Sequence, residues 1–215
     1  MGLILTLFYF FVNMKSNNAI IFDLGGVILN LDYQRTIDAF KKLGISNFEE
    51  MYTQASQSNV FDDFETGKIS SQHFINLLLP YLPVGTSPNK VVHAWNAMIL
   101  DFPKERLKLL DELKSKRRTF LLSNTNELHL QEVIRSLSKT TDRTLESYFE
   151  KVYYSHILNL RKPNLEIFEY VCKEQNLNPS ETIFIDDTIG HINGSNSFGL
   201  QGFHLEKGTT ITDLF

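Results

Sequence analysis

The chain has 215 residues, of which 42% are hydrophobic, so it is long enough to bury one full core and to carry a small inserted domain. Its 21 basic and 25 acidic residues give a net charge of −4 without a long basic run, which argues against nucleic-acid and membrane partners. The single cysteine, Cys172, excludes an internal disulfide and favours a reducing, cytoplasmic compartment.

Residues 3–12 form an apolar run close to the start of the sequence. The run is shorter than the roughly 20 residues of a membrane-spanning helix. It is similar to the apolar part of a secretory signal, but no Lys or Arg precedes it and no small-residue cleavage site follows it. We interpret residues 1–17 as an extension from an upstream start codon, with Met14 as a more natural start. An export signal is the alternative.

Three short apolar runs predict strands, because each is continuous and ends on a polar residue. They are residues 19–22 before Asp23, 119–122 before Ser123 and 182–185 before Asp186. Runs without polar alternation are typical of a parallel sheet that is covered on both faces. Weaker strands are predicted at residues 151–155 and 201–205.

Helical segments alternate with these strands, at residues 126–138, 164–176 and 188–198. The alternation predicts an α/β fold built from βαβ units, in which helices flank a Rossmann-like parallel sheet. Cys172 falls in the second of these helices. Because no neighbour in the sequence would stabilise its thiolate, we expect it to be a packing residue.

The long segment between the first two strands predicts a helical insertion, since one crossover helix requires far fewer residues. We place this insertion, which we call the cap, at residues 33–104 and expect it to lie over the ligand-binding edge of the sheet. The core then consists of residues 18–32 and 105–215. Internal repeats and low-complexity tracts are absent from the sequence.

Two apolar stripes predict helices within the cap. The first stripe stops at Gly44 and consists of Tyr33, Ile37, Phe40 and Leu43. A capping box follows at residues 46–49. The second stripe starts near Ser70 and consists of Phe74, Leu77, Leu78 and Tyr81. Three more aromatic residues are expected to be core packing rather than substrate contacts: Phe61, Phe64 and Trp95.

Four polar sites are predicted to meet at the carboxyl ends of the strands, where open α/β sheets bind their ligands. They are Asp23, Ser123, Lys162 and the pair Asp186–Asp187. Three carboxylates in one crevice repel one another unless a cation lies between them, and all-oxygen ligands favour Mg²⁺. Lys162 and Ser123 suit phosphoryl oxygens, and a carboxylate can attack phosphorus to form an aspartyl phosphate. The set therefore indicates metal-assisted phosphoryl transfer.

Each of these residues also has a plain structural interpretation. Asp23 and Ser123 both fit a turn after a strand, and the pair Asp186–Asp187 fits a helix cap. Lys162 fits the solvated residue before a helix that starts at Pro163. The catalytic interpretation is favoured by the combination of these residues, in this order and at these strand ends.

Four stretches carry a resemblance to a known family. They are "FDLGGVI" at 22–28, "LLSNTN" at 121–126, "RKP" at 161–163 and "FIDDTIGHINGSNSFG" at 184–199. With these stretches the chain resembles the haloacid dehalogenase (HAD) superfamily, specifically phosphatases with a helical cap inserted after the first strand. The stretches "FETGKIS" at 64–70 and "SNTNELH" at 123–129 are similar to small sugar-phosphate phosphatases, including those acting on glucose-1-phosphate.

The resemblance implies a phosphoric monoester hydrolase that works through an aspartyl-phosphate intermediate. Asp23 would be the nucleophile, and the phosphoryl group would be bound by Ser123, Asn124 and Lys162. The expected substrate is a small phosphorylated metabolite of the sugar-phosphate class. The oligomeric state is not predicted.

The resemblance also implies a Mg²⁺ site with one departure from the family pattern. The ligands would be Asp23, the backbone carbonyl of Gly25 and Asp187, and Asp186 would bind the metal directly or through another ligand. Most phosphatases of the family carry an aspartate where this chain has Gly25, and that aspartate acts as general acid and base. Such catalysis contributes about 10²–10⁴-fold in rate.

Three explanations for Gly25 remain open at this point. The substrate has a good leaving group, such as an anomeric sugar phosphate or an acyl phosphate. Another group replaces the acid, for instance Asp32, His129 or a cap residue, although we expect His129 to be structural. The third explanation is a slow or inactive site in a phospho-ligand-binding or regulatory protein.

Two further classes fit the sequence less well. A 2-haloacid dehalogenase also lacks the second acid but uses no Mg²⁺, so the pair Asp186–Asp187 would be an uncompensated cluster of charge. A phosphorylated receiver domain has its acidic pair before the phosphorylated aspartate, whereas here the pair comes last. The large insertion also argues against a receiver domain.

Overall fold

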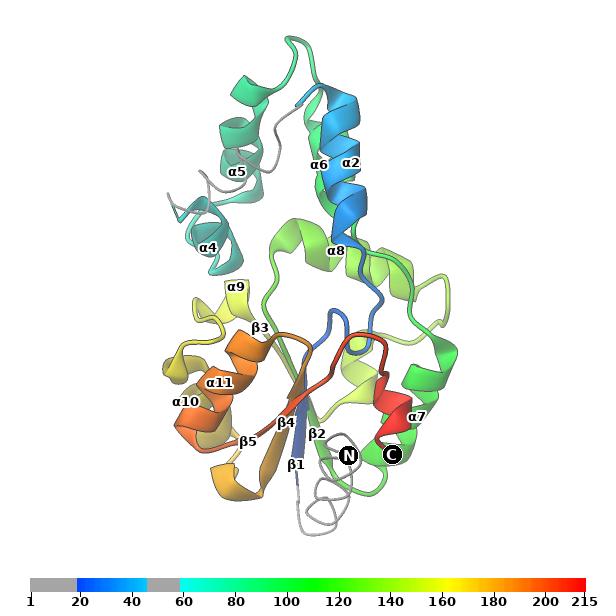
Figure 1. Ribbon diagram of the computed structural model, residues 1–215, viewed down its shortest axis with the longest axis vertical. Helices are drawn as coiled ribbons and strands as arrows, with labels where there is room; N and C mark the ends of the chain where they lie inside the picture. Colours follow the sequence, from blue (N-terminus) through cyan, green and yellow to red (C-terminus); the bar gives the residue numbers. More distant parts are fainter. Residues whose placement is uncertain (1–18, 46–58) are drawn as a thin grey trace.

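The computed structural model describes residues 19–45 and 59–215. The N-terminal extension and the capping box expected at residues 46–49 lie outside these residues. Figure 1 shows a parallel sheet in the lower part of the molecule and a group of helices above the carboxyl ends of its strands.

Five parallel strands form one sheet in the order β3-β2-β1-β4-β5. Their bounds are β1 (Ala19–Phe22), β2 (Arg118–Ser123), β3 (Lys151–Tyr154), β4 (Thr182–Asp186) and β5 (Gln201–His204). All five predicted strands are confirmed. Phe22 on the central strand pairs with Leu121 on one side and with Ile185 on the other, so three neighbouring strands end level at one edge.

Helices cover both faces of the sheet, and each face has its own hydrophobic core, because alternate residues of a strand point to opposite faces. One core contains residues of α7 (Lys104–Lys114) and α8 (Glu127–Leu137), and the other contains residues of α10 (Leu165–Glu174) and α11 (Ile189–Phe198). Cys172 is buried in the second core, as expected, and burial raises the pKa of its thiol to about 11. The predicted α/β fold is confirmed.

Shorter elements connect these layers. They are η2 (Leu145–Tyr148), α9 (Ser155–Leu158), η3 (Pro179–Glu181) and η4 (Ile211–Asp213). The three helices predicted between strands are present as α8, α10 and α11. The sequence analysis assigned no helix to α7, although Leu107, Leu110 and Leu113 recur at helical spacing and are buried.

The cap contains α2 (Tyr33–Leu43), α4 (Val60–Glu65), α5 (Ser71–Leu78), η1 (Leu79–Tyr81) and α6 (Pro88–Asn96). Asp32 caps the first turn of α2 by accepting a hydrogen bond from Gln34 N, and Gly44 ends the helix with a φ of 110°. Cap helices enclose a hydrophobic cluster of their own. We propose that the cap extends over residues 33–104, since α7 packs on the sheet.

The second predicted stripe of the cap needs a correction. Phe74, Ile75 and Leu78 are the buried residues of α5, whereas Tyr81 lies beyond the helix in η1 and is 57% exposed. The stripe ends early because Pro80 lies in η1, where the helix has already changed to a 3-10 turn. The expected core aromatics are confirmed, since Phe61, Phe64 and Trp95 are all buried.

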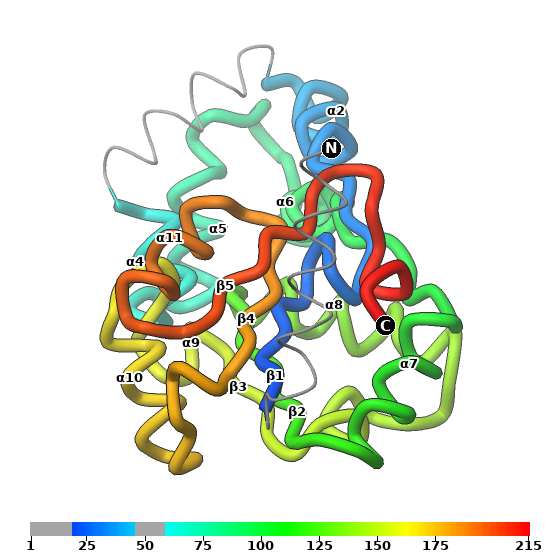
Figure 2. Tube along the Cα trace, turned by 60° about the horizontal axis from the view of Figure 1, so that its bottom comes forward, coloured from blue at the N-terminus to red at the C-terminus, as the bar shows by residue number. Residues whose placement is uncertain are grey.

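The chain crosses between core and cap on two segments that lie side by side. Leu31 and Ile99 form an antiparallel bridge, and the backbone N–H of Asn30 donates to Asp101 O at 3.0 Å. The backbone N–H of Asp32 donates to Met98 O at 2.9 Å. Figure 2 shows the cap helices gathered over the same end of the sheet from a second direction. The two crossings therefore form one short, hydrogen-bonded connection.

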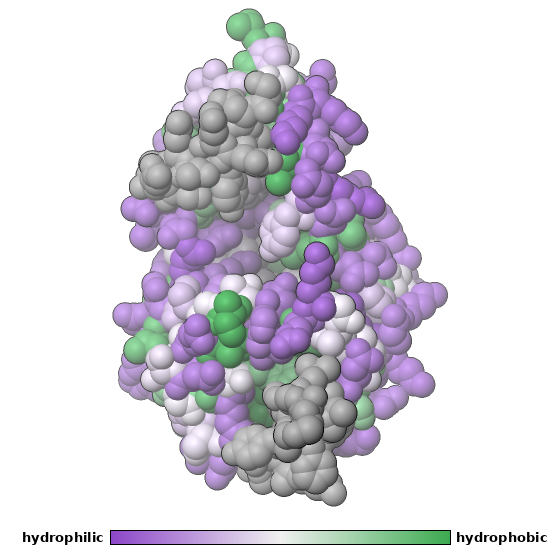
Figure 3. All heavy atoms as spheres, viewed as in Figure 1, coloured by the Kyte–Doolittle hydropathy of each residue, from purple (hydrophilic) through white to green (hydrophobic). Residues whose placement is uncertain are grey.

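Among residues 19–45 and 59–215, no helix is long and apolar enough to cross a membrane. Hydrophilic residues predominate on the face that Figure 3 shows, and the apolar areas on that face are small and separate. This surface is consistent with the net charge of −4 and the mixed distribution of charged residues.

Candidate active site

Lys162 lies at the centre of the site and is fully buried. Its ammonium group donates to Asp23 Oδ1 at 2.5 Å, to Asp186 Oδ2 at 2.7 Å and to the backbone oxygen of Leu122 at 2.9 Å. All three N–H groups of the side chain are thus satisfied. Burial alone would lower the pKa of Lys162, but the charges of Asp186 and Asp23 raise it above its ordinary value. The lysine is therefore a fixed positive charge between two strand ends.

Three carboxylates gather around this lysine. Asp23, Asp186 and Asp187 each offer one oxygen, and these oxygens all lie within 4.8 Å of one another. Burial raises the pKa of Asp23 to about 7, although the charge of Lys162 opposes the rise. Burial and the charge of Asp186 also raise the pKa of Asp187. One lysine is too little positive charge for three acids, and the all-oxygen donor set fits Mg²⁺.

The two adjacent aspartates have different surroundings. Asp186 is fully buried, and its oxygens accept hydrogen bonds from Lys162 Nζ and from the backbone N–H of Thr188 at 2.8 Å. Nδ1 of His191 lies 3.0 Å from both oxygens of Asp186. Burial alone would raise the pKa of Asp186, but Lys162 and His191 lower it to about 2. Asp187 is exposed, so its carboxylate is the freer of the two for a metal ion.

The two glycines after Asp23 leave space for different neighbours. A Cβ added at Gly26, whose φ is +73°, would lie 2.1 Å from Asp187 Oδ2, so only glycine allows this close approach. A Cβ added at Gly25 would lie 2.5 Å from Cδ1 of Leu31. The side chain of Leu31 therefore occupies the space that an acid at position 25 would enter.

Ser123 is the last residue of β2, and Asn124 begins the turn that follows. Ser123 is buried at the strand end, next to the backbone oxygen of Leu122 that Lys162 contacts. The side chain of Asn124 joins this turn to the lysine loop: Nδ2 donates to Lys162 O at 2.9 Å, and Oδ1 accepts from Lys162 N at 3.0 Å. The side chain of Asn124 thus orients the lysine loop, and the backbone N–H of Asn124 takes no part in these two bonds.

The two named substitutes for the missing acid are both engaged elsewhere. Asp32 caps α2 and pairs with Arg35 at 3.4 Å. His129 Nδ1 lies 3.2 Å from Asn126 Nδ2, which can only donate, so Nε2–H donates to Trp95 O at 3.3 Å. Burial lowers the pKa of His129 to about 4. A neutral histidine with both nitrogens bonded is structural, as expected.

Four residues that the sequence analysis gave no role surround the site. They are His191, Arg161, Glu65 and Ser155. His191 follows the acidic pair by one helical turn, so its spacing was a usable signal. The other three join the cap to the core, and their partners are distant in sequence.

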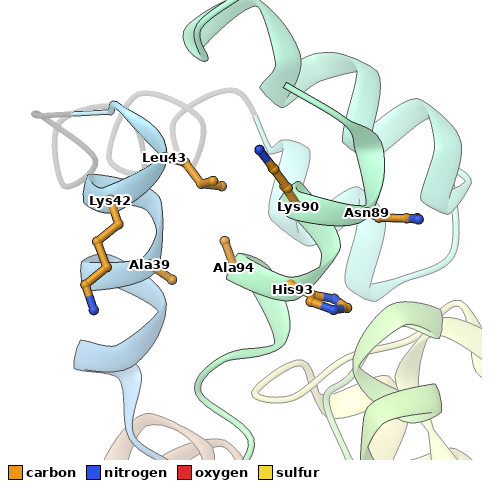
Figure 4. A pocket seen from close by; sticks show the side chains of 7 residues that line it. All are labelled: Ala39, Lys42, Leu43, Asn89, Lys90, His93 and Ala94. Atoms are coloured by element: carbon orange, nitrogen blue, oxygen red, sulfur yellow. The ribbon is translucent and has the colours of Figure 1, made fainter. Parts of the chain in front are cut away.

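A separate pocket lies between α2 and α6, on the cap alone. Figure 4 shows its lining: Ala39, Lys42, Leu43, Asn89, Lys90, His93 and Ala94. None of these residues belongs to the constellation around Lys162. The pocket is therefore separate from the candidate active site.

Comparisons with known proteins agree with this geometry. The model of the haloacid dehalogenase-like hydrolase family matches residues 18–199. The chain belongs to this family. The match includes every residue of the constellation, and it confirms both the expected superfamily and the expectation of a hydrolase.

Individual members of the haloacid dehalogenase-like family match over nearly the whole chain. A D-ribitol-5-phosphate phosphatase of Bacteroides thetaiotaomicron is 29% identical, over 88% of this chain and 92% of its own length. A HAD family enzyme of the same organism, solved with magnesium and inorganic phosphate, is 33% identical with a TM-score of 0.85, covering 93% of this chain and 99% of its own. A predicted HAD-like hydrolase of Porphyromonas gingivalis is 31% identical with a TM-score of 0.80, covering 90% and 93%.

Proposed function

We propose that this hydrolase is a Mg²⁺-dependent phosphatase that acts on a small phosphorylated metabolite through an aspartyl phosphate. The observation that carries the proposal is the position of Lys162, whose ammonium group lies between Asp23 and Asp186 within a cluster of three carboxylates. This arrangement places a nucleophile, a phosphoryl-binding cation and a metal-binding acid at one edge of the sheet.

Asp23 is the nucleophile of the proposed reaction. Lys162 holds Oδ1 of its carboxylate and so fixes the direction from which it meets the substrate. Asp23 attacks the phosphorus atom, the bond to the substrate's bridging oxygen breaks, and that oxygen leaves with a proton as the alcohol. Water then attacks the phosphorus atom of the aspartyl phosphate, which releases inorganic phosphate and restores Asp23.

The remaining polar groups hold the phosphoryl group and the metal. Ser123 and the positive charge of Lys162 stabilise the transferring oxygens, while Asn124 fixes the lysine loop and offers its backbone N–H. Asp23, the carbonyl of Gly25 and Asp187 would hold Mg²⁺, which supplies positive charge to the phosphoryl oxygens when bound. Asp186 orients Lys162 rather than the metal, because its oxygens already accept bonds from Lys162, Thr188 and His191.

The substrate class follows from the relatives and from the cap. The D-ribitol-5-phosphate phosphatase supports a sugar phosphate or sugar-alcohol phosphate as substrate. Magnesium and inorganic phosphate in the structure of a relative support the metal and the product. We place the enzyme in the cytoplasm, since its single cysteine is free and buried.

The test uses the full chain and a panel of phosphate esters. Phosphate release is measured from ribitol 5-phosphate, glucose 1-phosphate and acetyl phosphate, with Mg²⁺ and with EDTA. We expect turnover of at least one ester that requires Mg²⁺ and that Asp23→Asn abolishes. Absence of such turnover would falsify the proposal that the protein is an enzyme. If the protein also bound phosphate tightly, the result would favour a phospho-ligand-binding protein.

A further arm tests the dehalogenase alternative. Chloride release from 2-chloropropionate is measured under the same conditions, with and without Mg²⁺. We expect none, because a dehalogenase would leave the acidic cluster around Asp187 without a cation. Metal-independent chloride release would contradict the proposed function.

A further inference from the structure

The proposed reaction lacks a group that carries a proton to and from the reacting oxygens. Gly25 cannot supply one, and Leu31 fills the space where an acid at that position would lie. Asp32 and His129 are occupied by other partners. A proton carrier can still come from a segment that the fold brings to the sheet edge from elsewhere.

The end of helix α4 is such a segment, because it is fixed directly to the core. Ser155 Oγ donates to Glu65 O at 2.6 Å. Ser155 Oγ also accepts a hydrogen bond from the backbone N–H of Thr125 at 2.9 Å, and Thr125 lies two residues after Ser123. Asn159 Nδ2 donates to Thr66 O at 2.7 Å. These bonds hold the last residue of α4 against the turn that follows β2.

A glycine next to this segment shows how closely it approaches. Gly67 has a φ of +68°, and an added Cβ would lie 2.2 Å from the backbone oxygen of His156. Glycine at position 67 therefore permits backbone-to-backbone contact between cap and core. Figure 1 and Figure 2 both show α4 directly above α9, the helix that contains His156.

The side chain of Glu65 points toward the lysine loop. Its Oε2 lies 2.9 Å from Nη2 of Arg161, the residue before Lys162, and the side chain is 27% exposed. Burial raises the pKa of Glu65 to about 7, while the charge of Lys162 and the ion pair with Arg161 oppose the rise by favouring the carboxylate. A carboxyl group at this place can exchange a proton near neutral pH, as a general acid and base requires.

We propose that Glu65 is the general acid and base of this enzyme, supplied by the cap in place of the residue that Gly25 lacks. The inference rests on the proposed phosphatase function. In the first step Asp23 attacks phosphorus, the ester P–O bond breaks, and the Glu65 carboxyl gives its proton to the leaving oxygen. In the second step the Glu65 carboxylate takes a proton from water as the water oxygen attacks the aspartyl phosphate, and Asp23 leaves as a carboxylate.

The chain offers a matched control for this residue. Arg161 also pairs with Asp62, which lies one turn earlier on α4 and is 53% exposed. Asp62→Asn removes one partner of Arg161 while it keeps the carboxyl group of Glu65. Glu65→Gln removes the other partner together with the proton. A difference in activity between the two variants therefore reflects the loss of proton transfer by Glu65 rather than weaker docking of the cap.

The first experiment compares leaving groups. The values of kcat/KM are measured with Mg²⁺ for 4-nitrophenyl phosphate, phenyl phosphate and ribitol 5-phosphate. For Glu65→Gln we expect a loss of about 10²–10⁴-fold with ribitol 5-phosphate and a small loss with 4-nitrophenyl phosphate, whose leaving group needs no proton. Asp62→Asn should change all three by a similar, small factor.

The second experiment examines the aspartyl phosphate. With 4-nitrophenyl phosphate, Glu65→Gln should release a burst of one nitrophenolate per enzyme and then turn over slowly, because water attack lacks its base. A uniform loss across the three esters without a burst would overturn the inference, as would a Glu65→Gln enzyme that matches Asp62→Asn. If the unaltered enzyme hydrolyses no ester, the proposed function itself fails, which is a separate and recognisable outcome.

Discussion

Arg161 and Lys162 are neighbours in the sequence, but they hold two different networks of charge. Lys162 is fully buried between Asp23 and Asp186, whose side chains are 11% and 0% exposed. Arg161 is 24% exposed and pairs with two cap residues, Asp62 and Glu65, which are 53% and 27% exposed. Lys162 joins two carboxylates of the core, and Arg161 joins the core to the cap.

The two networks differ in what they contribute. A buried ion pair leaves an uncompensated charge when one partner is removed, whereas a solvent-exposed pair contributes little to stability. The core network, which is Lys162 with Asp23 and Asp186, is therefore rigid. The cap network, which is Arg161 with Asp62 and Glu65, can break and re-form its ion pairs at little cost in free energy. Contacts of this second kind would allow a cap to open and close.

The largest effect is expected from breaking the core network. Lys162→Met should lower the free energy of unfolding by about 3–5 kcal/mol, because Asp23 and Asp186 lose their buried partner. It should also abolish turnover. Urea denaturation measures the first effect, and a loss below about 1 kcal/mol would contradict the rigidity assigned to this network.

A smaller effect is expected from a methyl group in the metal site. Gly26→Ala places a Cβ against Asp187 Oδ2 at a positive φ, so the affinity for Mg²⁺ should fall by about 10–100-fold. Gly190→Ala is the control, because an added Cβ there meets nothing within 4 Å. Calorimetric titration with Mg²⁺ compares the two, and equal affinities would remove Gly26 from the metal site.

Acid should weaken the junction between core and cap through His129, which bonds to Trp95 O. The pKa of His129 is about 4 in the folded protein against an ordinary value of 6.5, so the unfolded chain binds the extra proton. The free energy of unfolding is therefore highest above pH 6.5 and declines as the pH falls toward and below 4, by about 3 kcal/mol in all. Urea denaturation at pH 7 and pH 5 should show a larger decline in the free energy of unfolding for the unaltered protein than for His129→Gln. Equal declines would contradict the role assigned to His129.

The smallest effect on stability is expected from the cap network. Arg161→Met should change the free energy of unfolding by about 1 kcal/mol or less, since Asp62 is exposed and Glu65 is partly exposed. Because the cap is then held less firmly, KM should rise more than kcat falls. A loss of stability equal to that of Lys162→Met would erase the distinction between the two networks.

The sequence predicted the core of the site because its signals are local. Asp23, Ser123 and Asp186 each end an apolar strand, and a parallel sheet with level strand ends brings such residues together. Lys162 follows from its place in the family pattern. These positions needed no knowledge of the cap.

The cap contacts were not predictable in the same way. Glu65 meets Arg161 only because α4 rests on α9, and that placement depends on Ser155, Asn159 and the close approach at Gly67. Ser155 and its partner Glu65 are 90 residues apart in the chain, and Asn159 and its partner Thr66 are 93 residues apart. Helix α7 was missed although its leucine spacing was readable.

Leu31 links the catalytic loop to the connection between core and cap. Its side chain fills the space beside Gly25, and its backbone bridges Ile99 where the two crossings lie side by side. An aspartate reintroduced at position 25 would have to displace a side chain at that crossing. The loop after Asp23 and the joint between core and cap are therefore mechanically coupled, because a side chain at position 25 and the rotamer of Leu31 would have to change together.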